Sequence, residues 1–178
     1  MAKKRKKSSA LGLALSAGAV IFAIAAVCMM FLNAVELVSG ENVLAQYTGV
    51  QVAFGYSETY PLIGEVKFLN FSIMNLLPYI LALAGAVVAL LAALSKKSFL
   101  LNIIAVACFV AAAVFFFTAA SYVSVAGSEG SGTLNVLVKN IVDALKDGDN
   151  LKIAIGSILG GAFSVVAAAC SALKIFVK

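Results

Sequence analysis

Few residues in this chain could do chemistry. The sequence has no histidine, so the usual proton shuttle and the commonest metal ligand are both missing. The three cysteines, Cys28, Cys108 and Cys170, each lie inside a long apolar stretch. Apolar surroundings disfavour the thiolate, so we expect these cysteines to pack as small apolar residues. No nucleophile–base pair or metal set is visible, and the sequence therefore predicts no enzymatic activity and no cofactor.

Two short motifs resemble ligand sites only superficially. Asp147-Gly148-Asp149-Asn150 has the look of a calcium loop, but it lacks the spaced oxygen ligands and the final Glu of an EF-hand. We interpret it as a turn before the last apolar stretch. Asn70-Phe71-Ser72 matches a glycosylation sequon, and its closeness to an apolar stretch favours a chance match.

The composition indicates the elements that must position these residues. The chain is 63% hydrophobic and 12% charged, whereas a soluble domain is about 45–50% apolar and about 25% charged. A chain of 178 residues cannot bury so large an excess in its own core. The sequence therefore predicts an integral membrane protein in contact with the lipid bilayer.

Four continuous apolar stretches predict four membrane-spanning helices, at residues 10–32, 76–94, 99–122 and 151–173. Continuous runs favour helices, because the strands of a membrane barrel would alternate over about 10 residues. We expect the first stretch to be retained as a span, since it exceeds the 7–15-residue apolar core of a cleaved signal peptide. The predicted fold class is an all-α, four-helix membrane bundle forming a single domain over residues 1–178.

The distribution of charge predicts the orientation. Residues 1–9, the short turn 95–98 and residues 174–178 hold nine Lys or Arg, and the two long connections hold four. The positive-inside rule then places both termini and the short turn in the cytoplasm, and we expect the protein to lie in the plasma membrane. All eight acidic residues lie in the two long, outer connections. The basic cluster Lys3–Lys7 abuts a span, which argues against a nucleic-acid partner.

The first outer segment, residues 33–75, predicts a small extracytoplasmic β-subdomain. Val43–Tyr56 is rich in β-branched and aromatic residues, and Glu65–Ser72 alternates apolar and polar residues on either side of a turn-rich stretch. Two or three antiparallel strands fit this pattern, and an irregular loop lying on the lipid headgroups is the alternative.

Aromatic and acidic residues of this segment form a candidate outer interaction surface. The tyrosines here, and Tyr79 in the second span, also fit anchors at the level of the headgroups. The surface consists of Tyr47, Phe54, Tyr56, Glu58 and Tyr60.

The second outer segment, residues 123–150, predicts an amphipathic helix. Its glycine-rich start, Gly127–Gly132, reads as a flexible connector. Residues 133–146 then place apolar side chains at helical spacing, with charged residues toward the other face. Such a helix could rest on the bilayer, cap the bundle or cover the β-segment, and the last of these fits its two lysines best.

The membrane interior of the predicted spans holds no Asp, Glu, Lys, Arg or His, which argues against ion-coupled transport. Asn75 and Asn102 could form hydrogen bonds between helices. Faces of small residues let helices approach closely, either within the bundle or in association with another copy or another membrane protein. These faces are Gly156, Gly160 and Ser164 in the fourth stretch, with Gly12 and Ser16 in the first.

The layout resembles the claudin-type arrangement of four spans, a short inner turn, a larger β-prone outer segment and a smaller one. Claudins carry a Trp, a Gly-Leu-Trp element and a Cys pair in the first outer segment, and this sequence has no Trp and no Cys there. No site residue is therefore carried over from claudins. The stretch from Thr48-Gly49 to Ala53-Phe54-Gly55-Tyr56 resembles small bacterial four-span membrane proteins, which implies a related fold and no particular activity.

Together these patterns predict a non-enzymatic membrane interaction or scaffold protein with an acidic outer surface. The alternative is a subunit of a small oligomeric channel or transporter. A homo-oligomer or another membrane protein is the expected partner in either case.

Overall fold

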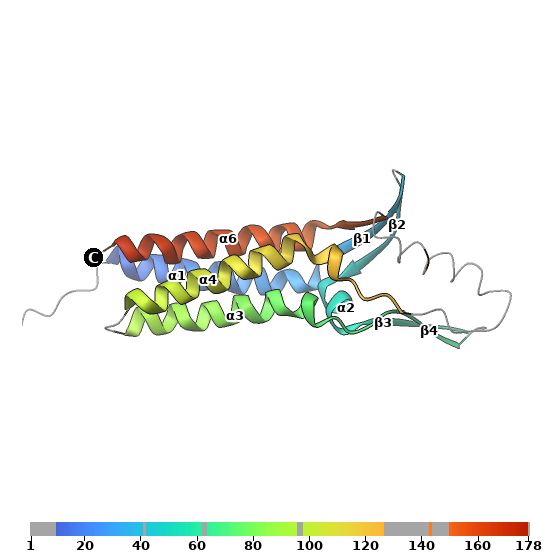
Figure 1. Ribbon diagram of the computed structural model, residues 1–178, viewed down its shortest axis with the longest axis horizontal. Coiled ribbons are helices and arrows are strands. Elements are labelled where there is room, and N and C mark those ends of the chain that lie inside the picture. The colour runs from blue at the N-terminus through green and yellow to red at the C-terminus, as the bar shows by residue number, and fades with distance from the viewer. Residues whose placement is uncertain are drawn as a thin grey trace, which may run out of the picture.

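Four long helices lie side by side and form an elongated bundle (Figure 1). The computed structural model describes residues 10–40, 42–61, 64–95, 98–126, 143 and 150–177. Each of the four helices is long and apolar enough to cross a membrane, so the predicted four-helix fold is confirmed at that level. They are α1 (Ala10–Cys28), α3 (Ile73–Leu94), α4 (Ser98–Phe117) and α6 (Ile155–Phe176).

The two ends of the bundle differ. At one end α3 finishes at Leu94 and α4 begins at Ser98, and we call this the turn end. All strands lie at the opposite end, which we call the strand end (Figure 1). There α1 continues into the short 3-10 helix η1 (Met29–Phe31), and α4 is followed by a second one, η2 (Ala119–Tyr122).

Five strands and a short helix, α2 (Gly49–Phe54), make up the strand-end subdomain. One sheet has the order β2-β1-β5 and the other pairs β3 with β4, all antiparallel. The strands are β1 (Asn33–Ser39), β2 (Asn42–Thr48), β3 (Tyr56–Tyr60), β4 (Gly64–Leu69) and β5 (Leu151–Ile153). The predicted β-subdomain is therefore present, and it recruits β5 from the second long connection.

Helix α2 interrupts a stretch that the composition alone predicts as strand. The Gln51 N–H donates to the Thr48 hydroxyl oxygen (3.3 Å), and the Thr48 N–H donates to the Gln51 side-chain oxygen (2.9 Å). This reciprocal capping box starts a helix. Gly55 ends it at φ +94°, a conformation that favours glycine.

The strand-end subdomain is joined to the bundle by backbone hydrogen bonds from several directions. Ala154, just before α6, donates its N–H to the carbonyl of Ala34 on β1 (2.9 Å). Ser72, just before α3, donates to the carbonyl of Ala53 on α2 (2.9 Å). The side chain of Ser72 also donates to the carbonyl of Tyr122 (2.8 Å). The starts of α3 and α6 are thus fixed to the subdomain.

The interior of the bundle is filled by small residues and two rings. Alanines from all four helices are buried along its length. Phe109 is 0% exposed and would clash with a Cβ at Gly85, and Phe116 is 1% exposed and would clash with one at Gly160. Phenylalanine rings therefore fill the space that the glycines leave open.

Four predicted boundaries need correction, and the first is the end of the third span, because α4 ends at Phe117 and not at residue 122. Residues 151–153 form β5, so the last long helix begins at Ile155 and not at residue 151. That helix continues to Phe176, which brings Lys174 into an apolar span expected to hold no charge. Helix α3 starts at Ile73, so Pro78 lies one turn inside it. The predicted amphipathic helix, residues 133–146, lies outside the described residues apart from Asp143.

Candidate functional site

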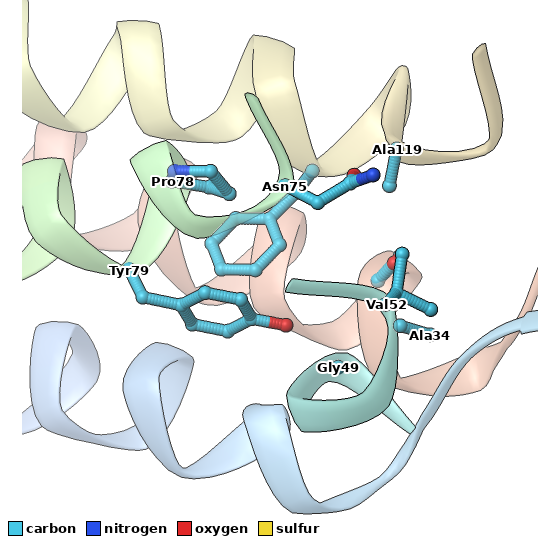
Figure 2. A pocket seen from close by; sticks show the side chains of 9 residues that line it. Ala34, Gly49, Val52, Asn75, Pro78, Tyr79 and Ala119 are labelled. Carbon is cyan, nitrogen blue, oxygen red and sulfur yellow. The ribbon is translucent and has the colours of Figure 1, made fainter. Parts of the chain in front are cut away.

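A small cavity lies where the bundle meets the strand-end subdomain. Figure 2 shows its wall, with Asn75, Pro78 and Tyr79 from α3 facing Gly49 and Val52 from α2. Ala34, Phe116, Ala119 and Ser157 complete the lining. The cavity is therefore lined by residues of three long helices, α3, α4 and α6, and of the strand-end subdomain.

The polar groups of this cavity are unusual for a bundle core. The Asn75 amide donates to the Ser72 hydroxyl (3.3 Å), but within the described part of the chain its oxygen has no hydrogen-bond partner. The Ser157 hydroxyl, in a residue that is 1% exposed, likewise has no partner among the described residues. Buried polar atoms of this kind normally have partners.

Tyr79 lies between the bundle and α2 and contacts both. Its ring packs edge-on against Phe116, with centroids 5.0 Å apart and planes at 86°. Its hydroxyl reaches α2, where a Cβ at Gly49 would overlap it. Figure 2 shows the ring pointing from α3 toward α2. Glycine is thus required at residue 49 by close approach and not by backbone conformation.

The size of the cavity limits its chemistry. The space open to the centres of water molecules is about 10 Å³, close to the minimum for a single water. Asn75, Ser157 and Tyr79 supply an amide and two hydroxyls, none of which is paired with a base. The site has room for at most one water molecule, and among the described residues that line it no nucleophile is paired with a base.

The predicted outer surface residues lie in three places: Tyr47 in the core of the subdomain, Tyr56, Glu58 and Tyr60 on β3, and Phe54 at the end of α2. Tyr47 is 5% exposed and packs against Tyr56 (centroids 6.0 Å apart), which in turn stacks on Phe68 (6.1 Å). Burial raises the pKa of Tyr47 to about 12. Tyr47 therefore supports the surface from below, and it belongs to the core of the strand-end subdomain.

Glu58 lies exposed on the β3–β4 ribbon, and half-buried Tyr60 donates its hydroxyl hydrogen to the Glu58 carboxylate (2.9 Å). This hydrogen bond holds the pKa of Tyr60 above its ordinary value. On the other face of the ribbon Ser57 donates to Glu65 (2.6 Å). We call Ser57, Glu58, Tyr60 and Glu65 the acidic ribbon. Its two carboxylates are held in place by neighbouring hydroxyls.

Phe54 lies apart from that ribbon, at the end of α2. It is 56% exposed and its ring lies 6.4 Å from that of Phe71, which is 53% exposed. Exposed aromatic rings at this level suit the boundary between lipid and water. The structure therefore separates Phe54 from Tyr56, Glu58 and Tyr60.

The small-residue faces lie in contacts within this chain. A Cβ at Gly156 would lie 2.7 Å from the carbonyl oxygen of Asn33, and one at Gly160 would lie 2.8 Å from the ring of Phe116. The Ser164 hydroxyl donates to the Gly160 carbonyl (2.8 Å). On α1 the buried Ser16 donates to the Gly12 carbonyl (3.2 Å). The contacts of Gly156 and Gly160 support the intramolecular alternative for the α6 face, and the burial of Gly12 and Ser16 supports it for the α1 face.

Metal and thiol chemistry find little support in the described part of the chain. There, no group of three or more His, Cys, Asp or Glu side chains could hold a metal ion. The three cysteines are free.

Asn75 was expected to bond between helices, and Tyr79 to act as an interfacial anchor. The structure brings both into one cavity, together with Ser157, which the sequence did not single out. In the sequence, the only feature that distinguishes these three residues is a polar side chain within an apolar stretch. In comparisons with known proteins, no family model and no curated protein matches this chain.

Proposed function

We propose that this protein is a non-enzymatic integral membrane interaction or scaffold protein that presents the acidic ribbon outside the cell. In this proposal the four helices span the plasma membrane and both termini are cytoplasmic. The excess of Lys and Arg at the turn end supports that orientation.

One observation carries the proposal. The strand-end subdomain is fixed to the bundle by backbone hydrogen bonds at the starts of α3 and α6 and at the end of η1, where Gly49 donates to the Leu32 carbonyl (3.1 Å). A surface attached at several points keeps one orientation relative to the membrane. Fixed orientation lowers the entropy cost of binding a partner, which suits a scaffold.

The chemistry of the acidic ribbon indicates the kind of partner. Glu58 and Glu65 are both exposed, and their hydrogen bonds to Tyr60 and Ser57 leave further carboxylate lone pairs free to accept. Lys or Arg side chains of a partner protein would complement Glu58 on one face of the ribbon or Glu65 on the other, and would steer the encounter. Exposed Lys67, which lies across from Ser57, offsets part of the charge on the Glu65 face.

The interior of the bundle supports an interaction role over transport. Phe109, Phe116 and the surrounding alanines are buried across the middle of the bundle. The polar Asn75 and Ser157 at the strand end are separated by this apolar layer from Asn102 at the turn end. Passage of a polar solute through one copy would require these rings to move.

Two measurements on the purified full chain test this proposal. In lipid nanodiscs, native mass determination at rising concentration should show a defined complex, either with a second copy or with a co-purified membrane protein. In liposomes, the protein should give no flux of Na⁺, K⁺ or Cl⁻ above that of empty vesicles. A strictly monomeric, partnerless protein would count against the scaffold role, and selective flux would favour the alternative, a channel or transporter subunit.

A further inference from the structure

Three buried polar atoms lie without a partner at the turn end. Within the described residues, the Asn102 side-chain oxygen, the Ser171 hydroxyl and the Lys174 ammonium make no hydrogen bond. Asn102 and Ser171 are each 2% exposed. An ammonium group in such surroundings is costly unless an anion accompanies it. At this end of the bundle, therefore, one buried cation lacks an anion, and two buried polar atoms lack hydrogen-bond partners among the described residues.

The three residues lie at similar depth. Helices α4 and α6 run antiparallel, and the contact between Phe116 and Gly160 fixes their relative position (Figure 1). Asn102 lies fourteen residues before Phe116, and Lys174 lies fourteen residues after Gly160. At about 1.5 Å per residue, both are about 21 Å from that contact, and Ser171 is about 4.5 Å nearer to it.

They also face the same interior. Asn102 precedes the buried residues Ala105 and Phe109 on α4 at intervals of three and four. On α6, Lys174 follows Ser171, which in turn follows buried Ala167. Residues at this spacing share one face of a helix. Lys174 therefore lies on the face of α6 that carries Ser171 and Ala167; the residue is half-buried and its side-chain nitrogen is buried.

This chain supplies no acidic side chain for Lys174. All eight Asp and Glu residues lie between residues 36 and 65 or between 129 and 149, in the two connections that leave the strand end. The charged side chains that flank the turn end in sequence are Lys3–Lys7, Lys96, Lys97 and Lys178, all of them cationic. None of these side chains can supply an anion for Lys174, which points to another molecule as its source.

We infer that Asn102, Ser171 and Lys174 form a binding site for the phosphodiester of an anionic lipid whose headgroup carries a hydroxyl, such as a glycerol headgroup. The phosphate pairs with Lys174 and accepts a hydrogen bond from Ser171, and the headgroup hydroxyl donates to the Asn102 oxygen. Lys174 lies in the last turn of an apolar helix, the depth at which lipid phosphates lie in a bilayer. A basic site between helices at a membrane surface suits an anionic headgroup.

Native mass spectrometry of the detergent-purified full chain, tagged after Lys178, tests this site. The chain is mixed with phosphatidylglycerol or with phosphatidylcholine of the same acyl length. The wild type and Lys174→Arg should retain phosphatidylglycerol preferentially. In Lys174→Gln, the preference for phosphatidylglycerol over phosphatidylcholine should be weaker by at least about fivefold. The matched control, Lys97→Gln, removes one charge from the same end and should lose much less.

Further comparisons separate this lipid site from general charge attraction and from a site for free phosphate. Equal loss in Lys174→Gln and Lys97→Gln would mean general charge attraction and would overturn the site. Inorganic phosphate and glycerol 3-phosphate at millimolar concentration should not displace the lipid; displacement by either would assign the site to a free phosphate. If Lys174→Gln fails to fold, Ser171→Ala takes its place, and an unchanged preference in that variant would also overturn the inference.

Discussion

Tyr79 on α3 and Gly49 on α2 meet at the junction of the bundle and the strand-end subdomain. The Tyr79 hydroxyl occupies space that a Cβ at residue 49 would need, and the Met30 carbonyl closes the same space from another side, 2.9 Å from that position. The pair therefore sets how closely the subdomain can approach the helices.

Gly49→Ala should destabilise the protein, because its methyl group overlaps the Tyr79 hydroxyl and the Met30 backbone. We expect a loss of about 1–3 kcal/mol in the free energy of unfolding, measured by denaturant titration in micelles. Tyr79→Phe should recover part of that loss in the double variant, since it removes one of the overlapping atoms. Gly18→Ala is the control, because its Cβ would meet only Cys170 at 3.5 Å. Equal losses at residues 18 and 49 would contradict the close approach.

Gly160→Ala and Gly161→Ala should differ although they are neighbours. Both would place a methyl group against a ring, at 2.8 Å from Phe116 and 2.6 Å from Phe117. Phe116 is 1% exposed and cannot move away, whereas Phe117 is 45% exposed and can turn outward. Thermal unfolding should show a loss of about 1–3 kcal/mol for Gly160→Ala and clearly less for Gly161→Ala.

The oligomeric state of the Gly160→Ala variant separates packing from association. Because Gly160 contacts Phe116 of its own chain, native mass determination should give the same assembly for this variant as for the wild type. Dissociation of an assembly without any loss of folding stability would instead place Gly160 between copies.

Stability should fall at high pH because of Tyr47. Burial raises the pKa of this tyrosine from 10.0 to about 12, so the folded protein holds the proton that the unfolded chain releases. The corresponding stability is complete below pH 10 and is lost as the pH rises from 10 to 12. In Tyr47→Phe, the free energy of unfolding lost between pH 10 and pH 12 should be smaller than in the wild type by about 1–2 kcal/mol. A fall of the same size in Tyr47→Phe and in the wild type would exclude Tyr47 as its source.

The long helices were predictable because each span is a continuous apolar run. The ends of these helices were harder to predict, because a charged residue such as Lys174 ends an apolar run in the sequence without ending the helix. The burial of the Lys174 nitrogen depends on the packing of α6 against α4, and no local sequence pattern predicts which helices pack together.

The strand-end subdomain was predicted only in outline. Residues 43–56 are rich in strand-forming types, yet Thr48 and Gln51 form a capping box that starts α2. That signal is present in the sequence and outweighs composition locally. The pairing of β5 with β1 joins segments more than a hundred residues apart, and it could not be deduced from either one alone.

The cavity residues were visible only as polar exceptions in apolar stretches. Asn75 and Tyr79 are four residues apart on one helix face, a spacing that is readable from the sequence. Their meeting with Ser157 and Gly49 requires the packing of α6 and α2 against α3.

Photocrosslinking in living cells tests the central claim most directly. A photoreactive amino acid replaces exposed Thr59, between Glu58 and Tyr60 on β3, and exposed Ser39 on β1 serves as the control position. We predict a discrete adduct of one mass from residue 59 and none from residue 39. The adduct should weaken at least about fivefold when Glu58→Lys and Glu65→Lys are combined, since charge complementarity directs the encounter. No adduct, or the same adducts regardless of position and charge, would contradict the proposed role of the acidic ribbon.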